Sequence, residues 1–152
     1  DGVLAELLAP HSKKYICLDS SAKVVMAASE RLRKLPHVEV IEGDMQALPF
    51  ENSRFDLILL MHALTYADKP ALAIAEAGRV LKKNGRLLLA CLAKHEHRAA
   101  VTPFGHVNLG FTEKELRKFA DKAGLEVLVC EAVTREKRPP HFEVLTLLAR
   151  KA

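Results

Sequence analysis

Segments with the apolar pattern of β-strands alternate along this chain with segments of helical pattern, and this alternation restricts the folds open to it. Short apolar or β-branched runs predict strands at 15–19, 38–42, 55–61, 86–92, 127–133 and 143–149. Apolar residues at helical spacing predict helices at 2–9, 21–34, 71–81 and 113–123. Strands that alternate with helices form a parallel sheet. Because no helix separates the last two strands, we expect them to form an antiparallel hairpin.

The ends of the expected helices carry signals of their own. Pro70 suits a first helical turn, where its missing N–H would have no partner. Thr112 and Glu115 have the spacing of a capping box at the start of the helix 113–123. Asn84 and Gly85 tolerate a positive φ, so they can close the helix that precedes the strand 86–92.

The composition disfavours several classes of protein. The net charge is +4, but the basic residues are interleaved with acids and aromatic residues make up only 5% of the chain, so a nucleic-acid surface is disfavoured. The apolar runs are too short to cross a bilayer. Cys17, Cys91 and Cys130 lie in strand-like runs and match no metal or redox spacing. We therefore expect buried thiols and a cytoplasmic location.

Acidic residues stand at or just after the carboxyl ends of two expected strands. Asp19 ends the strand 15–19, and Asp44 follows the strand 38–42 after Gly43. Ligands of open α/β sheets bind at this edge. Asp19 has two interpretations at this stage: it can accept hydrogen bonds from the hydroxyls of a ribose, or it can serve as an acid at the start of the next helix.

Residues 42–50, 79–87 and 1–5 together resemble segments of class I, Rossmann-like S-adenosylmethionine-dependent methyltransferases of the small-molecule type. Residues 42–50, EGDMQALPF, closely resemble the loop after the family's third strand. Residues 79–87, RVLKKNGRL, resemble its R-V-L-K-P-G-G-x-L connection but depart from it at Lys83 and Asn84. Residues 1–5, DGVLA, resemble the end of its Gly-rich loop.

The resemblance implies an α/β fold with a doubly wound, mostly parallel, seven-stranded sheet and an antiparallel C-terminal hairpin. It implies that 1–152 is one methyltransferase domain that is N-terminally incomplete and lacks its first, central strand. A sheet without that strand should expose a large apolar face, and we expect this stretch alone to fold poorly.

The resemblance also implies a cofactor, S-adenosylmethionine, and gives roles to individual residues. Gly2 corresponds to the last glycine of the cofactor-binding turn. Asp19 would accept from the ribose hydroxyls and Asp44 from the adenine amino group, while Met45 would cover the adenine ring. The full set of implied cofactor-binding residues is Asp1, Gly2, Asp19, Ser20, Gly43, Asp44, Met45, Met61 and His62.

The implied reaction is methyl transfer to a small-molecule acceptor by in-line displacement. The backbone near Met61 would meet the amino group of the cofactor, and His62 would lie near the sulfonium or the substrate. His62, Tyr66 and His97 are the candidate catalytic residues, because any of them could handle the proton of a hydroxyl or amine acceptor. The irregular segment 94–110 would form a lid over that acceptor.

His95, His97 and His106 could also be read as ligands of zinc. No Cys or carboxylate pattern supports this reading beyond Glu96, and transfer from a sulfonium needs no metal, so we expect none.

Two other functions stay open. Residues 92–111 resemble methyltransferase domains fused to winged-helix regulators, so the chain could be an S-adenosylmethionine-binding regulatory module without turnover. Nucleic acid would then be a partner only if a winged-helix domain precedes Asp1, and a homodimer is also left open. A nicotinamide (NAD)-dependent oxidoreductase is disfavoured, because Pro70 stands where a Tyr-x-x-x-Lys motif starting at Tyr66 would need lysine.

Overall fold

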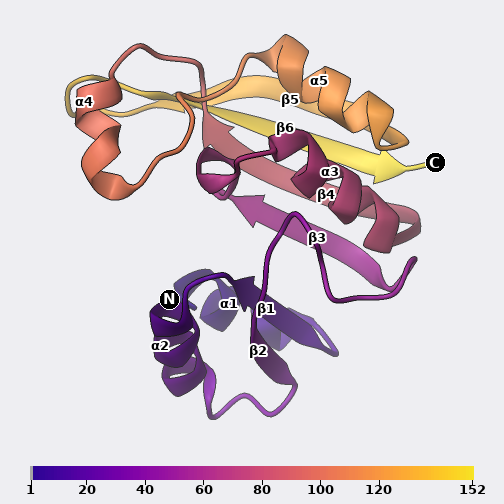
Figure 1. The fold of residues 1–152 in the computed structure, drawn as a ribbon. Coiled ribbons are helices and arrows are strands. Elements are labelled where there is room, and N and C mark those ends of the chain that lie inside the picture. The colour runs from indigo at the N-terminus through magenta and orange to yellow at the C-terminus, as the bar shows by residue number, and fades with distance from the viewer. Residues whose placement is uncertain (1) are drawn as a thin grey trace. The chain divides into compact units, whose positions relative to one another are not determined.

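The strands of the protein divide between two units of the chain, one ending at Pro49 and the other beginning at Phe50 (Figure 1). The computed structural model describes residues 2–152, and Asp1 lies outside the described residues. A parallel pair of strands belongs to the first unit and a mixed four-stranded sheet to the second. Within residues 2–152, no helix is both long and apolar enough to cross a bilayer.

The first unit alternates helices and strands in the order α1, β1, α2 and β2. Their bounds are Val3–Leu8 for α1, Tyr15–Asp19 for β1, Ala22–Leu32 for α2 and Val38–Glu42 for β2. The two strands are parallel, in a register that runs from Tyr15 opposite Val38 to Asp19 opposite Glu42. The core is small: Ala5, Ala28 and Leu32 are buried, and partly buried apolar residues of both strands pack against them.

The second unit contains the four-stranded sheet and the remaining helices. The strands are β3 (Phe55–Met61), β4 (Leu81–Leu92), β5 (Leu125–Arg135) and β6 (Glu143–Lys151), and the α-helices are α3 (Pro70–Val80), α4 (Arg98–Val101) and α5 (Glu113–Lys122). The strand order is β3-β4-β6-β5, with β3 and β4 parallel and the other two pairs antiparallel.

One face of this sheet forms the core of the second unit, packed with α3 and α5 (Figure 1). The residues on this face are completely or almost completely buried, among them Leu87, Leu89 and Cys91 of β4 and Leu145, Leu147 and Ala149 of β6. The alternating residues of the same strands, such as Leu88, point to the opposite face. Leu57 of β3 and Val129 of β5 are also exposed, so part of the sheet remains open.

The α/β class and the antiparallel end of the sheet are confirmed. The bounds of β1, β2 and β3 agree with the predicted ones at both ends. By contrast, β4 begins at Leu81 rather than at residue 86, because Leu81 pairs with Phe55 before the register shifts. Asn84 has a φ of 67°, the left-handed conformation expected of it. Among the thiols, Cys91 and Cys130 are buried, whereas Cys17 is only half-buried.

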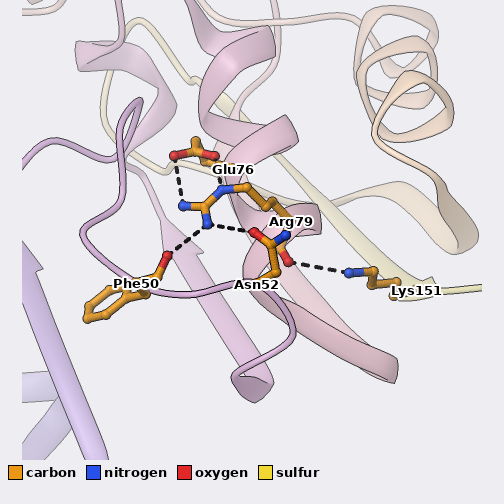
Figure 2. A network of polar contacts seen from close by, with 5 residues as sticks. All are labelled: Phe50, Asn52, Glu76, Arg79 and Lys151. Atoms are coloured by element: carbon orange, nitrogen blue, oxygen red, sulfur yellow. Dashed lines mark hydrogen bonds and ion pairs between the residues drawn. The ribbon is translucent and has the colours of Figure 1, made fainter.

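Polar contacts around Arg79 join three segments of the second unit (Figure 2). The guanidinium binds the Glu76 carboxylate at 2.6 and 3.1 Å, and it donates to the carbonyl of Phe50 at 2.7 Å and to Asn52 Oδ1 at 2.9 Å. Lys151 Nζ donates to the carbonyls of Arg79 and Leu81 at 3.3 and 2.7 Å. Arg79, in the 79–87 segment, is therefore architectural, since the contacts of its side chain and carbonyl tie the segment before β3 and the end of β6 to the last turn of α3.

Candidate functional site

The first group of predicted site residues lies at the carboxyl ends of β1 and β2. Asp19 ends β1 opposite Glu42, the last residue of β2. The Gly43 N–H donates to the Asp19 carbonyl at 3.0 Å, which extends the ladder by one hydrogen bond. Asp19 and Ser20 are thus brought beside the turn that begins at Gly43.

The Asp19 carboxylate serves the local fold with one oxygen. Its Oδ1 accepts from the backbone N–H of Ser21 at 2.8 Å, while the Ser21 hydroxyl caps α2 by accepting from Val24 N–H at 3.3 Å. Within residues 2–152, Oδ2 of Asp19 has no hydrogen-bond partner. The two interpretations of Asp19 are therefore compatible: one oxygen holds the turn into α2, and the other can accept from a ligand hydroxyl.

Asp44 organises the turn after β2. Its Oδ1 accepts from Gln46 N–H at 2.8 Å, and its carbonyl accepts from Ala47 N–H at 3.1 Å. The side chain of Asp44 is exposed and the neighbouring Met45 is half-buried. Gly43 allows this turn to approach β1 closely, since a Cβ there would stand 2.9 Å from Leu18 Cδ1.

Gly2 begins α1 in the left-handed conformation, with φ 90° and ψ 5°. A side chain there would be strained, and its Cβ would lie 3.1 Å from Leu32 Cδ1. Its carbonyl accepts from Glu6 N–H at 2.9 Å, so the residue fixes the start of the helix. The prediction for Asp1 falls outside the described residues.

The second group lies at the carboxyl end of β3, in the second unit. Met61 pairs with Ala90, and the His62 N–H donates to the Ala90 carbonyl at 2.8 Å. His62 has a φ of 55°, which is uncommon for a residue other than glycine and is often found at functional sites. Its side chain is exposed. Tyr66 follows in a 3₁₀ turn, Leu64–Tyr66, where it is 49% exposed.

The predicted catalytic residues do not form one cluster. Tyr66 makes an edge-to-face contact with His106, with ring centroids 5.3 Å apart. His97 instead lies beside His95, whose Nδ1 accepts from the His97 N–H at 3.1 Å, and both rings contact Phe142. The fold places the His97 ring against Phe142, in the hairpin between β5 and β6.

Sequence reasoning missed Asn108 and Phe142. The Asn108 side chain donates to the Leu64 carbonyl at 2.8 Å, and Val107 N–H donates to the Thr65 carbonyl at 2.8 Å. These bonds fasten the irregular segment to the 3₁₀ turn that carries Tyr66. No local pattern distinguishes either residue, because both act through partners far away in the chain.

The environment of His95 favours a neutral imidazole. Burial lowers the pKa of His95, and the neighbouring charges of His97 and His106 lower it further. In the part of the chain that the structure describes, no three His, Cys, Asp or Glu side chains are grouped so that they could hold a metal ion.

Residues 1–89, more than half of the chain, match the family model described as a methyltransferase domain. The chain therefore belongs to this family of methyltransferase domains, which uses S-adenosylmethionine.

Two curated relatives match the same part of the chain. An uncharacterised 37.1 kDa protein in transposon Tn4556 of Streptomyces fradiae is 41% identical over 88 residues, which are 58% of this chain and 25% of that protein. The demethylmenaquinone methyltransferase of Renibacterium salmoninarum is 32% identical over 89 residues, which are 59% of this chain and 36% of the relative. The chain thus matches only a minor part of these relatives' length.

The solved structures establish the fold over nearly the whole chain. The N-methyltransferase NodS of Bradyrhizobium japonicum, solved with S-adenosyl-L-homocysteine, superposes with a TM-score of 0.77 at 21% identity. The superposition covers 99% of this chain and 72% of NodS. The fold is therefore the Rossmann-like methyltransferase fold that the sequence predicted.

Proposed function

We propose that this protein transfers the methyl group of S-adenosylmethionine to a small-molecule acceptor by in-line displacement. The observation that carries the proposal is the edge formed by β1 and β2 in a methyltransferase-domain chain. There, Asp19 offers an uncommitted carboxylate oxygen beside the Gly43–Met45 turn. An acid at the end of a strand can accept from both hydroxyls of a ribose.

The turn after β2 suits the adenine end of the cofactor. One oxygen of Asp44 is needed for the Gln46 N–H, which leaves the other to accept from an exocyclic amino group. Met45 would supply apolar contact to the ring. A side chain at position 43 would require the Leu18 side chain to shift, so glycine suits this close approach of the turn to β1.

The residues at the end of β3, in the second unit, have proposed roles of their own. The backbone at Met61 would bind the amino group of the cofactor, and the exposed His62 would face the reacting groups. When bound, the cofactor supplies an electrophilic methyl group on its sulfonium. The chain's own part is to orient the acceptor, exclude water and accept a proton, for which His62 and Tyr66 are the candidates after β3, with His97 after β4.

A cytoplasmic location belongs to the same proposal. The three thiols are all free, which suits a reducing compartment.

Calorimetric titration of the complete protein with S-adenosylmethionine and S-adenosylhomocysteine tests the proposed cofactor site. Asp44→Asn keeps an oxygen for the Gln46 N–H but removes the carboxylate, so it separates loss of the ligand contact from loss of the turn. We expect affinity for both ligands to fall at least about tenfold in this variant, because a charged hydrogen-bond acceptor is lost.

Asp121→Ala, an exposed acid on α5, is the matched control and should bind like the parent protein. Absence of binding by a folded parent protein, or equal affinity in Asp44→Asn, would contradict the proposed site.

A further inference from the structure

Five aromatic and imidazole rings of the second unit, here called the ring row, form two contacting groups, Tyr66 with His106 and His95 with His97 and Phe142. The row consists of Tyr66, His95, His97, His106 and Phe142. His95 and Phe142 have ring centroids 4.5 Å apart, His95 and His97 5.8 Å, and Tyr66 and His106 5.3 Å. Three of these residues follow β4 and one follows β3, so the row begins at the edge of the sheet where the proposed acceptor would bind.

A pocket of about 260 Å³ opens beside one end of the ring row. It is formed by the segment after β4 and by the hairpin between β5 and β6, which lie side by side in the fold (Figure 1). His95, His97 and Phe142 line it, together with His141. Its size suits a small organic molecule rather than a single ion.

Two buried nitrogen atoms in the ring row, His95 Nε2 and His106 Nδ1, have no hydrogen-bond partner among residues 2–152. Since His95 Nδ1 accepts from the His97 N–H, a neutral His95 carries its proton on Nε2. A buried donor without an acceptor costs stability, so it marks a place where an oxygen atom of a ligand would bind favourably.

The charges around the pocket point to a ligand of low charge. Lys94 and Arg135 line it, but Lys94 pairs with Glu115 and Arg135 with Glu143, each at 3.4 Å. Within each pair the carboxylate neutralises the basic side chain, so these residues leave no surplus of positive charge to favour a phosphate. The flat rings favour a flat apolar ligand, because aromatic groups pack well edge-to-face or offset.

We propose that the pocket beside His95, His97 and Phe142 binds a small aromatic molecule with a ring-bound oxygen, and that His95 Nε2–H donates to this oxygen. Such a molecule would be the acceptor class of the proposed methyl transfer, so the inference rests on the proposed function. Phe142 and His97, which line the pocket together with His95, would then contact the ligand's ring.

The test uses 2-naphthol as the probe and its saturated counterpart decahydro-2-naphthol as the comparison ligand. The complete protein is first titrated with S-adenosylhomocysteine, and then each probe is titrated while the imidazole nitrogen signals are followed by NMR. We expect 2-naphthol to bind, to shift the His95 signals, and to bind at least about fivefold more tightly than decahydro-2-naphthol.

His95→Phe keeps a flat ring against Phe142 but removes the donor, so it should weaken 2-naphthol binding about tenfold. His11→Phe, at an exposed histidine of the first unit, is the matched control and should leave binding unchanged. If His95→Phe fails to fold, the shift of the His95 signals in the parent protein decides.

Three results would overturn the inference: no shift of the His95 signals, equal affinity for both probes, or saturable binding of inorganic phosphate in place of 2-naphthol. Failure of the proposed function has a different signature, since S-adenosylhomocysteine would then not bind in the first titration.

Discussion

Every residue of β1 is half-buried, whereas Leu87, Leu89 and Cys91 of β4 are completely buried. Both strands come from the same alternation of apolar strands and amphipathic helices, and both pair with a parallel neighbour. The difference lies in what surrounds them, since β4 also pairs with β6 and its unit contains four strands. Two strands make a marginal sheet, so the alternation defines local structure and the number of partners sets the depth of the core.

The largest expected effect comes from the deep core of the second unit. Leu147→Ala should lower the free energy of unfolding by about 3–4 kcal/mol, because a completely buried side chain leaves a cavity. Urea unfolding of the complete protein measures this change, and amide exchange shows where it acts. Equal loss of protection in β1 and β2 would break the comparison, because the two units would then unfold together.

A smaller loss is expected in the first unit. Leu32→Ala removes the largest buried side chain of the small core, and we expect a cost of about 2 kcal/mol because half-buried neighbours can relax into the space. Exchange of the β1 and β2 amides should accelerate while that of β6 stays unchanged. A loss as large as that of Leu147→Ala would show that the first core is as tightly packed as the second.

The capping box tests local structure independently of the deep core. Thr112 accepts from Glu115 N–H at 3.1 Å, and the Glu115 carboxylate accepts from Thr112 N–H at 3.2 Å. Thr112→Ala should cost about 1 kcal/mol, since an N-terminal amide of α5 loses its acceptor. Thermal unfolding measures the change, and an unaltered melting temperature would count against the cap.

The smallest effect at neutral pH should come from the thiols. Burial raises the pKa of Cys91 from 9.0 to about 12, so the folded chain keeps this proton where the unfolded chain loses it. The stabilisation is complete below pH 9 and is lost as the pH rises from there towards 12. We expect Cys91→Ala to reduce the alkaline loss of stability, with a smaller reduction in Cys17→Ala; identical pH profiles in all three proteins would refute this.

Much of the fold could be predicted from the sequence because its signals are local. The five residues YICLD are enough to predict β1. The left-handed conformation of residue 84 could be predicted because asparagine adopts it more readily than most residues do. The early start of β4 could not be predicted, because Leu81 becomes part of a strand only by pairing with Phe55. A pairing between distant segments cannot be recognised from the sequence of either segment alone.

The candidate site also contains residues whose neighbours could be predicted from the sequence and residues whose neighbours could not. Asp19 and Gly43 could be placed together from the sequence, because parallel neighbouring strands end at one edge. The ring contacts of His97 could not be predicted from the sequence, because they depend on the hairpin that brings Phe142 beside it. Residues at strand ends follow from topology, whereas residues on long loops follow from contacts that only the folded chain defines.

The state of the three thiols has a practical consequence for labelling. Burial raises the pKa of Cys17, Cys91 and Cys130 alike, so at neutral pH little thiolate is available to a maleimide dye. A cysteine introduced at an exposed position, such as Met26 in the first unit or Leu72 in the second, would react much faster. The natural protein therefore serves as its own background for attaching a donor and an acceptor dye, one to each unit, and following the distance between them by energy transfer.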